Sequence, residues 1–199
     1  MLNLPKNTEL SKQLPKKAIY AKFLMNSAAR ERFDADISKI MIVNEISPAT
    51  TTIPPGKNIS SFFVLHISLK TRDYAESNIS ALSKLIPQHI LFVLEYEGES
   101  RLAIYETKLI CGQWKKTDEQ SVELHGLNLD SVWENVVAQI GGITVEDGNT
   151  LDEQIAVNEQ REKLMKEISA LEKKARAEKQ PRKKFELVQK INEIKAQLI

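Results

Sequence analysis

The sequence predicts an α+β protein: a mixed β-sheet of four to five strands with packed helices, then a C-terminal antiparallel helical hairpin. Residues 90–105 hold two apolar runs on either side of a polar connection at 97–100, which is typical of a β-hairpin. A helical pattern separates the first run from an apolar strand at 60–70, as in a parallel βαβ unit. Residues 151–199 hold two helical segments with a heptad pattern, as in a coiled coil.

The composition fits one domain of ordinary size with a helical extension. Of the 199 residues, 42% are hydrophobic and 28% are charged, and an exposed helical arm would account for this charged share. The net charge of +1 gives no overall attraction to nucleic acid or to an anionic membrane. Residues 151–199 carry 12 Lys and Arg against 9 Asp and Glu, so the positive surplus lies there.

Cysteine usage and hydropathy predict a cytoplasmic protein. Cys111 is the single cysteine, so no intrachain disulfide forms, which suits a reducing compartment. No apolar run approaches the roughly 20 residues of a membrane-spanning helix. The first residues lack the apolar core of a secretion signal.

The N-terminal part is predicted to be helical up to residue 39, with prolines between short helices. The apolar residues that recur there at helical spacing, and that we expect to pack on the sheet, are Ile19, Tyr20, Phe23 and Leu24. Residues 37–46, rich in Ile and Val, are predicted as the first strand. Residues 47–56 are dense in Pro, Thr and Gly and predict a loop.

The middle of the chain is predicted to continue the sheet. Asp73 and Glu76 have capping-box spacing at the start of a helix over 74–85. The second strand of the hairpin is expected over 101–111, antiparallel to the first. A short edge strand is expected at 120–125.

A helix over 131–140 closes the predicted domain. Ser131 and Glu134 have capping-box spacing, and two glycines follow the helix at 141–142. The polar residues 146–150 are predicted as a boundary between an α+β domain (1–145) and the helical hairpin (151–199).

The hairpin prediction depends on two apolar stripes at steps of four, three and four residues. These are Leu164, Ile168, Leu171 and Ala175, then Leu187, Ile191, Ile194 and Leu198. Pro181 separates the two helices. The remaining apolar positions, Ile155, Val157, Phe185 and Val188, predict contact with the domain or with another chain, including a second copy in a homo-oligomer.

Candidate catalytic residues lie on the central hairpin. Glu106 and Lys108 alternate on a predicted strand, with Glu95 and Glu97 on the strand before it. Metal-dependent nucleases of the PD-(D/E)xK type hold Mg²⁺ with such a pattern, but the expected Asp before the motif is missing. Acid–base pairs across a hairpin also occur on solvated faces. No phosphate-binding glycine motif and no zinc spacing is present, so we expect no cofactor and no metal.

The predicted turn of the helical hairpin carries a basic cluster. Its members are Lys173, Lys174, Arg176, Lys179, Arg182, Lys183 and Lys184, against Glu172 and Glu178. Such a cluster suits the phosphates of DNA or an acidic protein. The alternative is a solvated tip whose charges complement the C-terminal dipole of the first helix.

Three segments carry a family resemblance: residues 4–20, 86–94 and 126–140, which include Leu14-Pro15-Lys16-Lys17, Ile86-Pro87-Gln88-His89 and Asp130-Ser131-Val132-Trp133. With these the chain resembles an uncharacterised prokaryotic family, a domain of unknown function. Its genes neighbour helicases and DNA methyltransferases in restriction-like or phage-defence clusters. The resemblance covers nearly the whole chain and implies an accessory subunit of a large DNA-acting ATPase.

Together these observations favour a non-enzymatic adaptor. Its α+β domain would dock on a larger partner, such as a helicase or methyltransferase of the same locus. The hairpin would contact that partner or DNA. The alternatives are a metal-dependent nuclease using Glu106 and Lys108, and a plain DNA-binding module.

Overall fold

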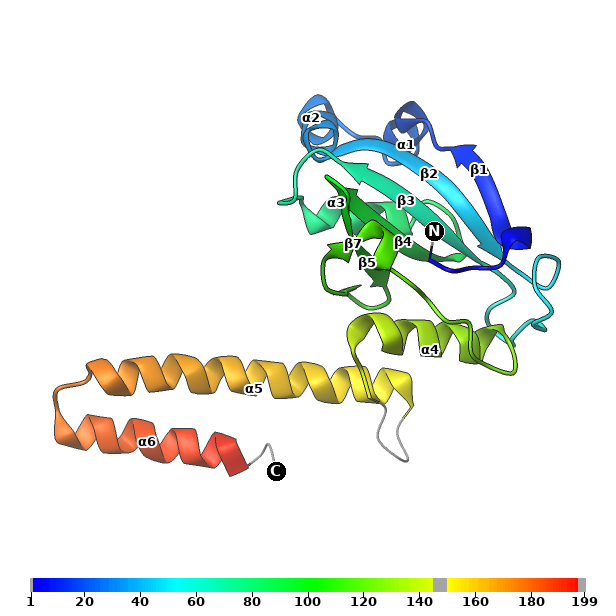
Figure 1. The fold of residues 1–199 in the computed structure, drawn as a ribbon. Coiled ribbons are helices and arrows are strands. Elements are labelled where there is room, and N and C mark those ends of the chain that lie inside the picture. The colour runs from blue at the N-terminus through cyan, green and yellow to red at the C-terminus, as the bar shows by residue number, and fades with distance from the viewer. Residues whose placement is uncertain (1, 145–149, 197–199) are drawn as a thin grey trace. The chain divides into compact units, whose positions relative to one another are not determined.

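A seven-stranded mixed sheet forms the centre of the first of two units in this chain (Figure 1). The computed structural model describes residues 2–144 and 150–196. The two units are Met1–Ile143 and Thr144–Ile199. Most of the predicted boundary segment, at 146–149, lies outside the described residues. Helices and strands combine into an α+β fold, which confirms the predicted class.

The sheet has the strand order β1-β2-β3-β4-β5-β6, with β7 paired to β5. Among the described strands, β3 and β4 alone run parallel, as predicted for the βαβ unit, and the other pairs are antiparallel. The strands are β1 (Glu9–Gln13), β2 (Ile37–Ile46), β3 (Phe62–Leu69), β4 (His89–Tyr96), β5 (Glu99–Tyr105), β6 (Leu109–Cys111) and β7 (Lys115–Lys116).

The sheet is larger than the four to five strands that the sequence predicts. β1 lies in a region that the sequence predicts to be helical. All five of its residues are exposed, so the sequence lacks the apolar alternation that would indicate a strand. The predicted strand over 101–111 divides into β5 and β6. The predicted edge strand at 120–125 is wrong: the structure forms an isolated bridge between Ser121 and Leu2 there.

The turn between β4 and β5 has two residues, Glu97 and Gly98, and not the four predicted. Tyr96 and Glu99 are register partners, so the ladder continues to the turn. Glu97 and Gly98 both have positive φ angles, of 50° and 83°. Two positive φ angles in a two-residue loop define the hairpin turn whose twist matches that of the strands.

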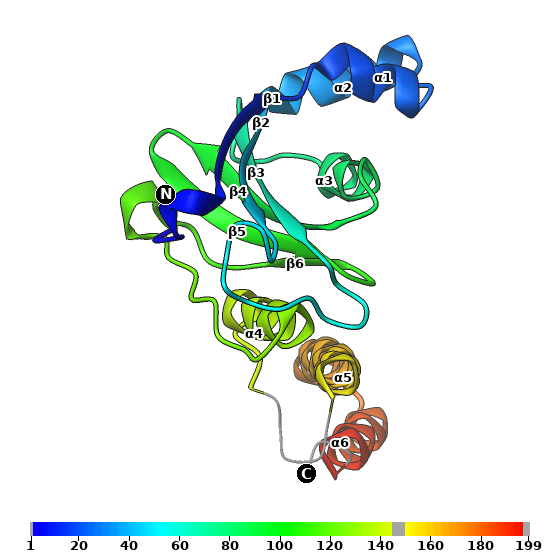
Figure 2. The same ribbon diagram turned by 90° about the vertical axis from the view of Figure 1, so that its right-hand side faces the viewer.

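Helices cover both faces of the sheet (Figure 2). α1 and α2, as well as the crossover helix α3, pack on one face, where buried residues of all three join the main hydrophobic cluster. On the opposite face, the Trp133 ring of α4 lies 5.0 Å from the ring of Phe62 in β3. The bounds are α1 (Lys16–Lys22), α2 (Ser27–Asp36), α3 (Glu76–Ser83) and α4 (Leu129–Gly141).

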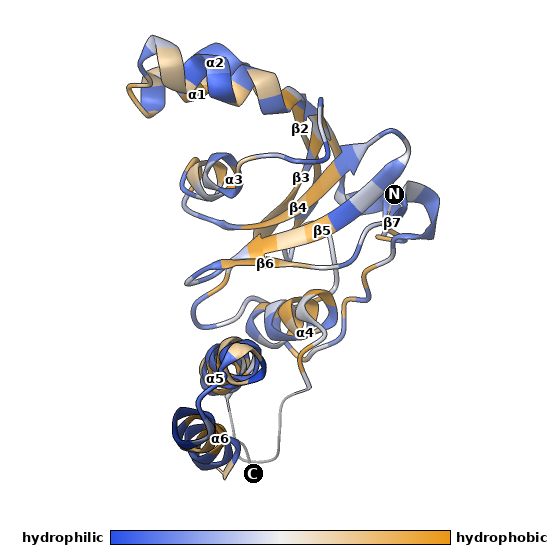
Figure 3. Cartoon of the chain, turned by 90° about the vertical axis from the view of Figure 1, so that its left-hand side faces the viewer, coloured by the Kyte–Doolittle hydropathy of each residue, from blue (hydrophilic) through white to orange (hydrophobic). Residues whose placement is uncertain are grey.

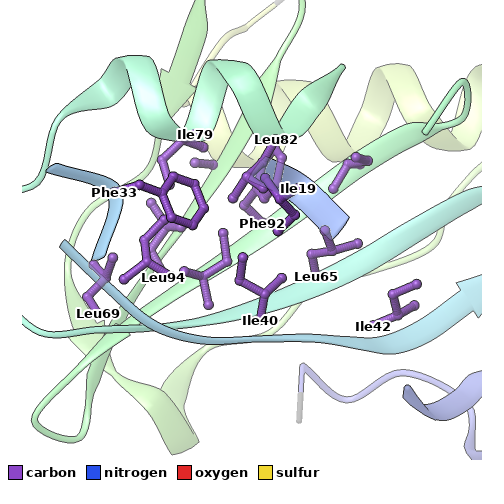
Figure 4. Close-up of a cluster of buried hydrophobic side chains, with 14 residues drawn as sticks. Ile19, Phe33, Ile40, Ile42, Leu65, Leu69, Ile79, Leu82, Phe92 and Leu94 are labelled. Carbon is purple, nitrogen blue, oxygen red and sulfur yellow. The ribbon is translucent and has the colours of Figure 1, made fainter. Parts of the chain in front are cut away.

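The main core lies under α2 and α3 (Figure 4). Ile79 and Leu82 of α3 and Phe33 of α2 pack onto the β4 residues Phe92 and Leu94, and all five are fully buried. Burying such a side chain contributes about 1.5–3 kcal/mol. Figure 3 shows the apolar character of the central strand β4, which is why β4 is the middle of the sheet.

The start of α3 depends on a residue far away in the sequence. The predicted capping box of Asp73 and Glu76 is wrong, because α3 begins after Ala75 with no side-chain cap of its own. Instead, Asp36 Oδ2 accepts hydrogen bonds of 2.8 Å from Ala75 N and from Asn78 Nδ2. The end of α2 therefore supplies the acceptor that satisfies the first turn of α3.

The cap of α4 lies three residues before the predicted cap, and the helix begins at Leu129. Asn128 caps the helix and forms a capping box with Ser131, so the predicted pair of Ser131 and Glu134 is wrong. The predicted end is confirmed: Gly142 adopts the left-handed conformation with φ of 60°. Val132, Val136, Val137 and Ile140, which share one face of α4, are buried.

Asp130 in the first turn of α4 fastens the loop before β3. Its carboxylate accepts hydrogen bonds of 2.8 Å from the backbone N–H groups of Lys57 and Ile59. Desolvation acts to raise the pKa of Asp130, but the backbone donors of 57–59 outweigh it and lower the pKa. A Cβ at Gly56 would overlap this carboxylate, so the position requires glycine.

The second unit is a helical hairpin of α5 (Leu151–Ala177) and α6 (Pro181–Ala196). The predicted stripes form its core: buried Ile168, Leu171, Ala175, Ile191 and Ile194, with Leu164 and Leu187 packed against them. Leu198 lies outside the described residues. Glu167 and Lys190 add an ion pair of 3.4 Å between the helices.

Candidate functional site

The basic cluster lies at the turn of the helical hairpin, and we call it the basic tip. It comprises Lys173, Lys174 and Arg176 of α5, Lys179 of the turn, and Arg182, Lys183 and Lys184 of α6. All seven side chains are exposed. Pro181 sets the turn, because its fixed φ suits the first position of a helix.

The charges of the basic tip are almost unneutralised. Arg182 Nε lies 3.6 Å from Glu186 Oε1, and both side chains are exposed. Within the described residues, the other six cations pair with no carboxylate. A surface pair of this kind is worth at most about 1 kcal/mol, so the tip retains a strong positive potential.

Helix dipoles account for only part of this cluster. Lys174 and Arg176 lie in the last turn of α5, where the dipole favours cations. Arg182, Lys183 and Lys184 lie in the first turn of α6, which contains no acidic residue. Cations there face the positive end of the dipole, at a cost of about 0.3–1 kcal/mol each. The hairpin fold itself therefore gives no reason for these three charges.

A groove of about 620 Å³ opens between the helices at the basic tip. Its apolar lining residues are Ala177 and Leu187. The charged lining residues are three lysines and two glutamates: Lys174, Lys183, Lys190, Glu178 and Glu186. The basic cluster identified in the sequence does not include Ala177, Leu187 or Lys190. A helical pattern could have indicated Lys190, because it lies four residues after Glu186 and three after Leu187, on the same face of α6.

Two apolar side chains of α6 are exposed, and both neighbour groove-lining residues in sequence. Phe185 is 63% exposed and Val188 is 41% exposed. The sequence predicts contacts for them with the domain or a second chain, and that remains a prediction. Figure 3 shows α6 as largely hydrophilic with some apolar stretches.

The structure separates the candidate catalytic residues. Glu106 and Lys108 lie in the turn between β5 and β6, where Glu106 N donates a 3.0 Å hydrogen bond to Lys108 O. The prediction that both lie on one strand face is therefore wrong, because a polar turn interrupts the predicted strand. Glu97 lies in the β4–β5 turn and is exposed.

The side-chain carboxylates of Glu106 and Glu95 each lie against another residue of the first unit. Glu106 Oε1 accepts a 2.7 Å hydrogen bond from Trp133 Nε1 of α4. Glu95 Oε2 lies 2.8 Å from His66 Nε2 of the neighbouring strand β3. Burial lowers the pKa of His66, whereas Glu95 acts to raise it and Lys39 adds to the lowering.

The other histidines make local contacts. The ring of His89 lies 5.0 Å from that of Trp133, and His125 Nε2 lies 2.6 Å from Glu123 Oε2. Over residues 2–144 and 150–196, no group of three or more His, Cys, Asp and Glu side chains is arranged to hold a metal ion. In the same ranges, no helix is long and apolar enough to cross a membrane.

Comparison with known proteins gives a family for this chain. A family model described as "Domain of unknown function (DUF4391)" matches residues 2–198. The chain belongs to the DUF4391 family. The match spans both units of the DUF4391 protein, so the hairpin is part of the family domain. Neither curated proteins nor solved structures gave a match.

Proposed function

We propose that this DUF4391 protein is a non-enzymatic adaptor of a DNA-acting system, in which the helical hairpin presents its basic tip to a polyanionic surface. In this proposal the larger partner is a helicase-type ATPase or a DNA methyltransferase, which is what the family resemblance of the sequence implies. The tip contacts that partner or the DNA on which it acts.

One observation carries the proposal: Arg182, Lys183 and Lys184 lie in the first turn of α6, against the dipole of their own helix. In the isolated chain this arrangement is unfavourable. A polyanion bound at the tip makes this arrangement favourable, because phosphates are attracted both to the cations and to the positive end of α6. A binding role therefore accounts for charges that the fold does not need.

The core of the hairpin supports this role. Buried residues of both helices hold the turn in place, so six of the seven cations project from the end of α5 and the start of α6, and Lys179 projects from the turn between them. Binding then requires little ordering of the backbone, which limits the entropic cost of association.

The candidate nuclease residues support an adaptor more than an enzyme. Magnesium-dependent hydrolysis requires carboxylates that converge on one ion. Here Glu106 accepts from Trp133, Glu95 lies against His66, and Glu97 is in a separate turn.

Neutralising the α6 charges in the full chain tests the tip. The tip variant Arg182→Gln/Lys183→Gln/Lys184→Gln is compared with a control that has the same loss of charge, Lys6→Gln/Lys12→Gln/Lys17→Gln, all exposed residues of the first unit. We expect the tip variant to bind labelled duplex DNA at least about tenfold more weakly at low salt, with a shallower dependence on salt. The control variant should bind like the wild type.

The stability of α6 distinguishes binding from a structural role. Removing three cations from the positive end of a helix should leave α6 equally stable or slightly more stable. A tip variant that loses helical content would instead show that these residues support the fold. Equal DNA binding by tip and control variants would exclude DNA as the ligand of the tip.

A further inference from the structure

A second cluster of cations lies at the carboxyl ends of β3 and β4, in the first unit. The loop that leaves β3 carries Arg72 and Tyr74. Arg101 of β5 is the register partner of Leu94, near the end of β4. Open sheets bind ligands beyond the carboxyl ends of their parallel strands, at the position that this cluster occupies.

Trp114, just before β7, joins these residues into one cluster. The Arg72 guanidinium carbon lies 4.8 Å from the centre of the Trp114 ring. The Arg101 guanidinium carbon lies 5.8 Å from the same ring and 5.7 Å from the ring of Tyr74. We call Arg72, Tyr74, Arg101 and Trp114 the arginine–aromatic cluster. Cation–π contacts fix the orientation of both guanidinium groups.

Two hydrogen-bond donors of the cluster are buried and have no nitrogen or oxygen acceptor. These are Nε of Arg101 and the hydroxyl of Tyr74. A guanidinium nitrogen can only donate, so its partner must be an acceptor. Arg72 has one, since its Nη1 lies 2.9 Å from Glu99 Oε2, but no carboxylate in the described ranges pairs with Arg101. Buried donors without acceptors are rare and require an explanation.

The Tyr74 hydroxyl remains a donor at neutral pH. Burial raises its pKa, the neighbouring Cys111 sulfur raises it further, and Arg101 acts in the opposite direction. A protonated hydroxyl beside a guanidinium presents two kinds of donor to one acceptor. Arg101, Tyr74 and Trp114 are all partly exposed, so the cluster lies at the surface of the first unit.

We propose that the arginine–aromatic cluster binds a phosphate group, which accepts hydrogen bonds from the Arg101 guanidinium and the Tyr74 hydroxyl. Guanidinium forks match phosphate oxygens in pairs, and a phosphate offers further oxygens to the hydroxyl. The phosphate belongs either to a small phosphorylated ligand or to nucleic acid. This site lies in the first unit and does not depend on the basic tip.

The fluorescence of Trp114 reports directly on the cluster. The chain has two tryptophans, and Trp133→Phe leaves Trp114 as the only one. This background replaces the indole that packs on Phe62 by a smaller aromatic ring and loses the hydrogen bond to Glu106. Neither tryptophan lies in the hairpin, so Trp114 reports on the first unit. Pyrophosphate, ADP and a 5′-phosphorylated single-stranded oligonucleotide are titrated at constant ionic strength, with chloride as the reference.

The proposal predicts a saturable change in fluorescence with at least one phosphate-bearing probe and none with chloride. Saturation by pyrophosphate or ADP identifies a small phosphorylated ligand, whereas saturation by the oligonucleotide alone identifies nucleic acid. We expect Arg101→Met to weaken binding at least about tenfold and Tyr74→Phe several-fold. Arg30→Gln is the control, because Arg30 makes an equivalent contact with Tyr20, at 5.6 Å, elsewhere in this unit.

Thermal unfolding of the otherwise unsubstituted chain provides an independent measurement. The probe that saturates the fluorescence should raise the Tm of the wild type and of Arg30→Gln equally, that of Tyr74→Phe less, and that of Arg101→Met least. The proposal is overturned if all three probes behave like chloride into the millimolar range. It is also overturned if Tyr74→Phe, which retains the ring, binds as tightly as Arg30→Gln.

Discussion

Trp133 Nε1 donates a 2.7 Å hydrogen bond to Glu106 Oε1, which links α4 to the turn between β5 and β6. Trp133 is 4% exposed, so its indole N–H depends on this acceptor. Glu106→Ala should therefore lower the free energy of unfolding by about 1–3 kcal/mol. Urea unfolding followed by tryptophan fluorescence measures this, since both tryptophans lie in the first unit.

The same variant separates the adaptor from the nuclease. If the protein is an adaptor, Glu106→Ala changes stability and leaves any contact with nucleic acid intact. An unchanged unfolding midpoint, together with loss of a Mg²⁺-dependent cleavage of DNA that the wild type performs, would instead assign Glu106 to catalysis.

Gly56 and Asp130 provide a second prediction. Gly56→Ala places a Cβ on the Asp130 carboxylate and should destabilise the first unit by about 1–3 kcal/mol. Gly98→Ala is the control, because its Cβ meets no atom within 4 Å and only the positive φ is strained. Combining Gly56→Ala with Asp130→Ala removes the clash, so the double variant should lose less stability than the two single losses combined. Additive losses would show that the clash is relieved elsewhere.

His66 should titrate below the ordinary pKa of about 6.5 for histidine. Because burial lowers the pKa in the folded state, the unfolded chain binds the proton more strongly. The contribution of His66 to stability is then complete above the unfolded pKa and is lost as the pH falls through the folded pKa. NMR titration of the ring protons, assigned with His66→Gln, measures the value.

Glu95→Gln extends the His66 prediction. Glu95 acts to raise the pKa of His66, so removing its charge should lower that pKa further. A His66 pKa that rises in Glu95→Gln would show that the carboxylate is not the dominant neighbour of the ring.

Leu171 tests the hairpin as a separately packed unit. Leu171→Ala opens a cavity in the core of the hairpin and should cost about 2–5 kcal/mol. Amide hydrogen exchange should speed up across α5 and α6 and stay unchanged in β3 and β4. Met165→Ala is the control because Met165 is 63% exposed, and it should change exchange little. Equal effects from both variants would contradict the assigned core.

Periodic segments could be predicted from the sequence. β2 has the predicted ends and α5 forms as predicted, because their apolar residues repeat at strand or helix spacing over ten or more residues. β1 could not be predicted, because its exposed polar residues join the sheet only through pairing with β2. The cap of α3 could not be predicted either, since the acceptor is Asp36, about forty residues earlier.

The candidate sites also differ in how far they could be predicted from the sequence. The basic tip is contiguous in sequence, so its charges are visible there, but their conflict with the dipole of α6 depends on the helix beginning at Pro181. The strand over 101–111 looks continuous because apolar runs flank Glu106 and Lys108, and only the β5–β6 pairing shows the turn. The arginine–aromatic cluster combines three separate segments, and no local pattern indicates it.

The most direct test of the adaptor role is partner retention by the full chain in its native host. Tagged wild type, the tip variant at Arg182, Lys183 and Lys184, and the control at Lys6, Lys12 and Lys17 are purified under identical conditions, with and without nuclease treatment. We predict that wild type and control retain the same DNA-acting ATPase or methyltransferase, and that the tip variant loses it while remaining folded. Equal retention by all three proteins would contradict a function of the basic tip in docking.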